Sequence, residues 1–370
     1  MRISRLVIGL FLAITSLTVS AQDYTNLYQT ASPFNGNDAG KLSFRIENAN
    51  FIRNHEYDSP VIKGYTLTGL WVRPMVEYYA SEKLRVQLGG HFLKYHGQDK
   101  INKISPWFSL TFRPTDYFEA TVGNFNNDNN FGMIAPLHEP DHFLTEKPKA
   151  SVQFKYFKGR WDAEVWLNWS KFIEENDPFQ ERFAVGLRAD YQFYNQNDWD
   201  LRGTFQFVTT HRGGEIDTSD DRIESIGNKG AGIKWTKKCG GSLWGGTAMY
   251  LDYKDFTNRG ERAFEDGKAL YVDGYWKNNG WQIGAGFWSA NKLIAPLGRK
   301  IYQSVNELDG SKYPDRQLVS GRLCKTFEIM DGARFGLETD AYFDLKESTF
   351  SYTWGIQLIF TESFFIKKLK

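Results

Sequence analysis

Apolar and polar residues alternate along much of this chain, most regularly near its end. In the run Phe350-Ser-Tyr-Thr-Trp-Gly-Ile-Gln-Leu-Ile-Phe360, every even position is apolar or aromatic and almost every odd position is small or polar. A period of two places these sets on opposite faces of a β-strand. Because the alternation recurs between clusters of Gly, Asn, Asp and Pro, we predict sixteen strands, near 42–56, 67–79, 84–96, 104–114, 118–126, 150–158, 161–173, 182–194, 199–212, 225–237, 242–254, 268–277, 280–291, 318–329, 333–345 and 349–360.

The predicted connections alternate in length. Every even-numbered join is a tight turn, such as Gly159-Arg160 or Asn278-Asn279. Six odd-numbered joins are longer, whereas those near 97–103 and 346–348 are short; the long ones lie near 57–66, 127–149, 174–181, 213–224, 255–267 and 292–317. Short periplasmic turns and longer outer loops are typical of outer-membrane barrels. The fold class predicted is therefore all-β, a transmembrane antiparallel up-and-down β-barrel of about 16 strands, with a soluble β-sandwich as the alternative.

The two ends of the chain differ from the predicted barrel. Arg2 and Arg5, an apolar stretch and the small residues Val19-Ser20-Ala21 form the pattern of a secretory signal peptide over residues 1–21. We predict a periplasmic lead at 22–40, a barrel at 41–361 and a basic C-terminal tail at 362–370. The expected location is the cell outer membrane.

Composition agrees with strands rather than helices. Aromatic residues make up 16% of a chain whose mean hydropathy is −0.50, which is typical of a barrel because half of each strand faces water. The net charge of +1 indicates no nucleic-acid partner. Cys239 and Cys324 have no metal-binding spacing and are expected to be free thiols. No cofactor is predicted.

The strand faces predicted to point inward carry charges of both signs in near balance. The inward basic residues include Arg73, Arg85, Arg113 and Arg188, and the inward acidic residues include Asp190, Asp252 and Asp340. Such residues indicate a polar channel with weak charge preference, or salt bridges across the wall. The two interpretations are compatible.

The connection 127–149 contains a His-Glu-x-x-His sequence at His138 to His142. On a helix this spacing brings two imidazoles to one face for zinc, but Pro140 argues against a helix here. We therefore predict no metal site and keep His138 and His142 as weak candidates. The same connection contains apolar residues, including Phe131, Met133 and Leu137. These residues indicate that it folds inward against the wall.

The sequence shows no recognisable nucleophile constellation. The histidines lie at 55, 91, 96, 138, 142 and 211, without an adjacent partner motif of the kind that barrel hydrolases require. We predict no catalytic residues and expect that the chain is not an enzyme.

Sixteen alternating strands, tight turns, a long loop after the fifth strand and an aromatic residue ending the last strand at Phe360 resemble the porins of Gram-negative outer membranes. The segment Val122-Gly-Asn-Phe-Asn-Asn-Asp-Asn-Asn-Phe-Gly-Met-Ile-Ala-Pro-Leu also resembles outer-membrane proteins of the Bacteroides group. The resemblance implies that the loop after the fifth strand, about 128–148, narrows the pore. The residues 361–370, which run past the usual aromatic end, depart from the porin pattern.

The function predicted is passive diffusion of small polar solutes through a water-filled barrel. The alternatives are a non-conducting receptor or assembly barrel and an outer-membrane barrel enzyme. Membrane lipids and small solutes are the expected partners, and homo-oligomerisation stays open. Loop carboxylates are expected to face inward arginines across the pore, which gives as pore-lining residues Arg73, Arg85, Arg113, Asp128, Glu139, Asp141, Arg188 and Asp190.

Overall fold

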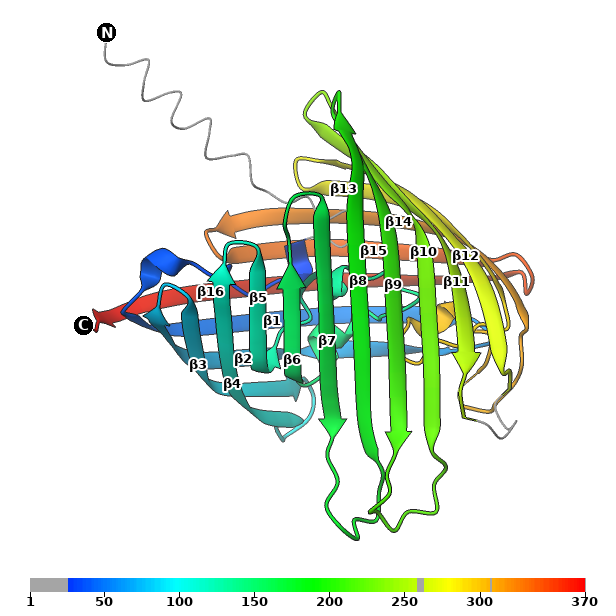
Figure 1. The fold of residues 1–370 in the computed structure, drawn as a ribbon. Helices are drawn as coiled ribbons and strands as arrows, with labels where there is room; N and C mark the ends of the chain where they lie inside the picture. The colour runs from blue at the N-terminus through cyan, green and yellow to red at the C-terminus, as the bar shows by residue number, and fades with distance from the viewer. Residues whose placement is uncertain (1–25, 258–262, 307, 370) are drawn as a thin grey trace.

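The structure, a computed structural model, describes residues 26–257, 263–306 and 308–369, so the predicted signal peptide 1–21 lies outside the described residues. These residues form a closed barrel in which each strand pairs antiparallel with its sequence neighbour and β1 pairs with β16 (Figure 1). The strands are β1 Lys41–Asp58, β2 Lys63–Ser81, β3 Leu84–Tyr95, β4 Lys103–Thr115, β5 Phe118–Phe125, β6 Lys149–Tyr156, β7 Trp161–Lys171, β8 Glu181–Gln196, β9 Trp199–Gly213, β10 Glu224–Cys239, β11 Ser242–Asp255, β12 Asp266–Asn278, β13 Trp281–Asn291, β14 Asp315–Met330, β15 Ala333–Asp344 and β16 Thr349–Lys368.

The predicted strand count and up-and-down order are confirmed, while two boundaries differ. The expected long join near 57–66 is wrong, because β1 and β2 continue to pair as far as Asp58 and Lys63 and leave a short connection. The expected tail at 362–370 is largely strand. Residues Thr361 to Lys368 of β16 pair with the first part of β1, from Lys41 to Glu47. The aromatic residue Phe360 therefore does not end the last strand.

The alternation in sequence corresponds to the two faces of the wall. On β7, Trp161 and Trp169 are exposed on the outer face, whereas Trp166 is buried in the lumen. Asp252 is an exception to the predicted facing. Its neighbours Leu251 and Tyr253 are buried and pack in the cluster inside the barrel, so Asp252 points outward. On this strand Met249, Leu251 and Tyr253 pack against internal segments, whereas Trp244 and Tyr250 are exposed on the outer face.

Three segments besides the strands lie inside the barrel. They are the first part of the lead, with the short helix η1 Asn26–Tyr28; the loop 127–149, with η3 Asp128–Gly132 and α2 His142–Thr145; and the part of the loop 292–314 that includes η4 Lys300–Tyr302. The second short helix of the lead, η2 Gly36–Asp38, has no buried residue and lies beside Glu82 in the turn between β2 and β3. No helix in the described ranges is long and apolar enough to cross a membrane. The lead was expected to be periplasmic, but its Leu27 and Tyr28 are buried in a cluster with wall residues.

Candidate functional site

The loops 127–149 and 292–314 contact each other in the lumen. The backbone N–H of Glu139 donates to the carbonyl of Leu297 at 2.7 Å, and the N–H of Arg299 donates to the carbonyl of Ala135 at 2.8 Å. Phe131, Met133 and Leu137 are buried in one apolar cluster with residues of 292–314. The expected inward packing of the loop 127–149 is therefore present, and a second loop shares it.

A buried group of ion pairs joins these loops to the wall. We call it the central ion cluster, and its members are Tyr28, Arg53, Glu139, Asp141, Arg299, Arg322, Glu338 and Asp340. Arg53 on β1 is fully buried and contacts Asp141 at 3.0 Å and Asp340 at 3.2 Å, as well as Glu338. Arg299 contacts Glu139 at 2.9 Å and Asp340 at 3.2 Å. The hydroxyl of Tyr28 in the lead donates to Glu338 at 2.6 Å. All three internal segments thus meet here.

His55 lies beside this cluster and links it to a set of aromatic side chains. Its Nε2 lies 3.2 Å from a carboxylate oxygen of Asp141, and its Nδ1 lies 3.0 Å from the hydroxyl of Tyr57. The ring stacks on Tyr65 at 4.3 Å between centroids. Sequence reasoning missed this contact because it joins β1 to a loop more than eighty residues away.

The loop carboxylates were expected to lie opposite Arg73, Arg85 and Arg113, but none of the three arginines forms an ion pair with them among the described residues. Arg73 contacts Glu47 at 2.7 Å, and Arg85 and Arg113 each donate to lead carbonyls, those of Ser32 and Phe34, at 3.2 Å.

The loop carboxylates have other partners. Asp128 accepts the backbone N–H groups of Thr30 and Ala31, while Glu139 and Asp141 belong to the central ion cluster. The physical reason is the lead, which contacts Arg85, Arg113 and Asp128, whereas Arg73 is paired with Glu47 on the wall.

Arg188 and Asp190 are brought together on β8, beside the start of the loop 127–149. They form an ion pair at 2.6 Å, and Lys234 on β10 contacts Asp190 at 3.2 Å. Gly132 sits against Arg188 with a φ of +71°, and a Cβ there would lie 2.4 Å from the Arg188 side chain. Only glycine fits this backbone conformation and close approach without strain.

His138 and His142 do not share a helix. The helix α2 begins at His142, after Pro140, so the arrangement used by zinc proteases is absent from this segment. His138 Nδ1 bonds Asn130, and His142 Nε2 lies 3.5 Å from Glu146. The described residues contain no group of three or more His, Cys, Asp or Glu side chains that could hold a metal ion.

Burial keeps both histidines neutral. Desolvation, with a smaller contribution from His142, lowers the pKa of His138 well below its usual range, and burial also lowers the pKa of His142. Burial raises the pKa of Asp128 to about 6. Burial opposes ionisation of Glu146, but Lys149 and His142 outweigh it and lower its pKa to about 2.

We expect the loop 127–149 to become less protected as pH falls below about 6.5, the ordinary pKa of histidine. The loosened loop binds protons on His138 and His142 more readily than the packed loop does, so stability present above that pH is lost below it. Protonation of Asp128 has the opposite effect on stability, because its pKa is raised in the packed loop and this loop therefore binds the proton more readily than the loosened one. Hydrogen exchange at about pH 7 and pH 5 in an Asp128→Asn background would measure the histidine effect. If adding His138→Asn or His142→Asn to this background leaves the change in exchange between pH 7 and pH 5 unaltered, the two histidines do not cause the pH dependence.

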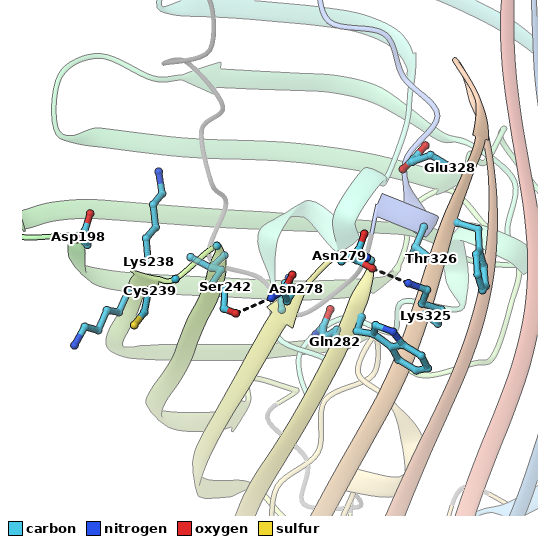
Figure 2. Close-up of a pocket in the computed structure, with 18 residues that line it drawn as sticks. Asp198, Lys238, Cys239, Ser242, Asn278, Asn279, Gln282, Lys325, Thr326 and Glu328 are labelled. Atoms are coloured by element: carbon cyan, nitrogen blue, oxygen red, sulfur yellow. Dashed lines mark hydrogen bonds between the residues drawn. The ribbon is translucent and has the colours of Figure 1, made fainter. Parts of the chain in front are cut away.

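Cavities lie at both ends of the barrel. At the end with the tight turns, a cavity of about 1210 Å³ is lined by the turns after β10 and β12 and by β14. Figure 2 shows Lys238, Lys325 and Asp198 around it, with Lys325 donating to the carbonyl of Asn279. At the other end, which we call the loop end, a cavity of about 630 Å³ is lined by strand ends, residues 146–150 and Pro296-Leu297. We call this second cavity the vestibule. The paired loops 127–149 and 292–314 lie in the lumen between the two ends.

The loop end also carries a histidine–serine pair on the outer wall. His211 on β9 and Ser225 on β10 are cross-strand partners, and Nδ1 lies 2.8 Å from Oγ. Residues an even number of positions apart on a strand lie on the same face. His211 therefore lies on the face of the exposed Phe205, opposite the buried Gln206 and Val208, and the pair faces outward.

Aromatic rings surround this pair. The His211 ring packs on Phe183 at 4.8 Å, and Phe183 packs on Trp169. Aromatic side chains are typical of the membrane interface. A second hydroxyl–imidazole contact joins Thr68 and His96 at 3.0 Å, in an exposed position. Neither pair can be recognised from sequence spacing, because only the strand register brings the partners together.

Comparison with known proteins gives a family and a fold. The model of the Lipid A 3'-O-deacylase-type family matches residues 34–369. No curated protein matches the sequence. Three similar solved structures are OmpTΔL8, a loop L8 deletion mutant of an outer membrane protein of Vibrio cholerae (14% identity, 87% of this chain and 99% of that chain, TM-score 0.52); OpdK from Pseudomonas aeruginosa (10%, 88% and 100%, 0.51); and the outer membrane protein OprD from Pseudomonas aeruginosa (9%, 92% and 98%, 0.50).

These comparisons confirm one expectation and contradict another. The chain has a porin-like barrel fold, and its fold and its neighbours are those of the outer membrane, as predicted. The expectation that it is not an enzyme is wrong at the level of the family, which is described by a deacylase activity. Catalytic residues that are adjacent in sequence are absent from this chain, but on a barrel wall partner residues come from different strands.

Proposed function

Because the chain belongs to the Lipid A 3'-O-deacylase-type family, we propose that it hydrolyses an acyl ester of an acylated sugar lipid in the outer leaflet. The observation that carries this proposal is the His211–Ser225 contact on the outward face of the loop end. Barrels of this kind present their longer loops to the outside. An ester in the outer leaflet would therefore lie at the level of this pair.

The geometry suits nucleophilic catalysis. Ser225 Oγ lies within hydrogen-bond reach of an imidazole nitrogen, which is the arrangement that activates a serine. Phe183 packs against the His211 ring and limits its rotation. The backbone N–H of Ser225 donates to the Thr257 hydroxyl at 2.9 Å, which fixes the start of β10 beside the next loop.

The reaction needs only this pair, the ester and water. His211 takes the Ser225 hydroxyl proton as Oγ attacks the ester carbonyl carbon, forming a tetrahedral intermediate. The carbon–oxygen bond to the sugar then breaks, and His211 returns the proton to the leaving sugar oxygen. Water, deprotonated by His211, attacks the acyl-serine and releases the fatty acid, and Ser225 recovers its proton.

The direct test is acyl release by refolded protein in vesicles that contain purified lipid A. Mass spectrometry should find free fatty acid and a lipid A species lighter by one acyl chain. Folding is checked separately, by the resistance of the barrel to unfolding in detergent. A folded protein that leaves lipid A unchanged over many hours would overturn the proposal.

A second candidate function is passage of small polar solutes, which the two end cavities favour. The lumen between them is filled by paired loops, so passage requires these loops to separate. The loops are held by backbone hydrogen bonds at Ala135, Glu139, Leu297 and Arg299, by a shared buried apolar cluster and by the Arg299–Glu139 ion pair, and all of these must break for passage. Homo-oligomerisation stays a prediction.

Shortening both loops should open the barrel. Because a sixteen-stranded barrel is generally wide enough for an aqueous channel, a variant lacking 130–147 and 294–301 should conduct in planar bilayers, while the intact protein should show little conductance. Shortening the loop 174–180, which does not contribute to the internal apolar clusters, is the control. Equal conductance of the intact and doubly shortened proteins would place the loops outside the conducting path.

A further inference from the structure

The outer wall of β1 carries two amide side chains where lipid is expected. Ala49 and Phe51 are buried inside the barrel, so Asn48 and Asn50 face outward, because residues on a strand alternate between its faces. The register surrounds the two amides on this face with apolar side chains, namely Ile46 and Ile52 on β1, Leu70 and Val72 on β2, and Leu358 and Phe360 on β16. Both amides therefore lie in the apolar band that lipid chains cover.

The two amides are only partly satisfied by their own chain. The Nδ2 of Asn48 donates to the backbone carbonyl of Trp71 at 2.6 Å, and the Nδ2 of Asn50 donates to the Oδ1 of Asn48. A side-chain amide has two N–H donors and an acceptor oxygen, and the Oδ1 of Asn50 accepts no hydrogen bond from the part of the chain that the structure describes. Hydrocarbon offers these groups no partner, so leaving them against lipid is costly. Because an amide both donates and accepts, the same amides on a second copy of the chain would satisfy them.

The wall next to these amides has a row of short side chains. Each of Pro74 on β2, Gly90 on β3 and Pro106 on β4 is followed by a residue that is buried in the lumen, so all three face outward. Gly90 pairs with Pro106, and the register of β2 with β3 brings Pro74 beside Gly90. Proline donates no backbone hydrogen bond, so two prolines in strands that have neighbours on both sides weaken the sheet. The row is short and rigid, which allows a second wall to approach closely with little loss of side-chain entropy.

We infer that the outer wall of β1 to β4 is the interface of a homodimer, in which Asn48 and Asn50 hydrogen-bond to the same amides of a second copy. Copies in one membrane point the same way, so a two-fold axis that relates them runs along the membrane normal and brings this part of the wall against itself. Self-complementary amides fit that symmetry. The His211–Ser225 pair on β9 and β10 lies about half way round the strand order from β1 and β2. The dimer therefore leaves that pair facing lipid, and the inference goes beyond the proposed hydrolysis.

The experiment counts protein copies in vesicles at a low protein-to-lipid ratio. Refolded protein is labelled with one dye at Cys239, which is exposed, whereas Cys324 is buried, and photobleaching steps are counted for each particle. Most wild-type particles should bleach in two steps. The double variant Asn48→Leu, Asn50→Leu should weaken association at least about tenfold, because hydrogen bonds between membrane segments are lost, and it should stay folded because leucine suits the lipid face. The matched control Ser289→Leu removes a polar side chain from the outer wall of β13, between the buried Trp288 and Ala290, and should dimerise as wild type does.

A second arm locates the contact by oxidative crosslinking in a Cys239→Ser background. At least one of Ile46→Cys, Leu70→Cys and Val72→Cys should give a covalent dimer, and Ile233→Cys, on the exposed outer wall of β10, should give none. Single-step bleaching of wild type, equal association of wild type and the double variant, or no crosslink through any of the three interface positions would each overturn the inference. The double variant should release fatty acid at the wild-type rate. Because neither arm measures acyl release, failure of the proposed hydrolysis would not change these outcomes.

Discussion

Replacing His211 with Asn should lower the rate of acyl release roughly 10²–10⁴-fold, the usual contribution of a general base. Ser225→Ala should reduce it to the same background, because the nucleophile and its base act as a unit and their losses do not add. Both side chains lie on the outer wall rather than in the packed lumen, so the barrel should stay folded. The measurement is the initial rate of fatty acid release from lipid A vesicles.

The Thr68–His96 contact supplies the matched control for this prediction. It has the same donor–acceptor chemistry at the same end of the barrel, but its hydroxyl is that of a threonine and the contact is exposed. Thr68→Val and His96→Asn should therefore leave the rate unchanged. If these variants lose activity and the His211 and Ser225 variants keep it, the catalytic pair is Thr68–His96 and the assignment to His211–Ser225 is wrong.

Arg53→Met should cost about 3–5 kcal/mol of stability, the usual result of removing one partner from a buried ion pair. Arg53 is surrounded by Asp141, Glu338 and Asp340, and its loss leaves these carboxylates buried with too little positive charge. The effect should be read from chemical unfolding of the refolded protein. Adding Glu338→Gln should recover part of the loss, since one uncompensated charge is then removed.

Arg202→Met is the corresponding control. Arg202 pairs with Asp200 two residues away on the same strand, at 2.7 Å, and both side chains are partly accessible to solvent. Pairs of this kind contribute about 0–1 kcal/mol. Equal destabilisation by the two substitutions would show that the central ion cluster has no special role in holding the internal segments.

The sequence predicted the wall of this protein well and its interior poorly. Strand faces depend on a local period of two, so β7, β8 and β15 could be assigned from neighbouring residues alone. The interior depends on contacts between segments far apart in sequence. The lead residue Tyr28 meets Glu338, and Glu139 meets Arg299, and no local pattern encodes either pairing. Asp252 was assigned to the wrong face because β11 turns apolar residues toward the internal loops.

For the candidate residues too, the facing of a side chain could be predicted from the local alternation, whereas its contacts with distant segments could not. Arg188 and Asp190 were predicted to face the lumen, and both are buried there, because the alternation of faces along a strand determines their side. The contact with Lys234 on β10 could not be predicted because it spans the lumen side of β9 between strands that do not pair, and the contact with Gly132 could not because the loop position was unknown. His211 and Ser225 were both visible in the sequence, but thirteen residues separate them and only the β9–β10 register places one beside the other.

The extension of β16 has a consequence for how the barrel is assembled. Thr361 to Lys368 form the seam with Lys41 to Glu47, the part of β1 whose Arg45 and Glu47 hold Thr30 of the lead. The final strand of the chain thus completes the wall at the point where the lead is anchored. The same residues of β1 therefore pair with the end of β16 and hold the lead, so the pairing of this seam and the docking of the lead should stabilise each other. Removal of Thr361 to Lys368 would leave Lys41 to Glu47 as an unpaired edge beside the anchored lead.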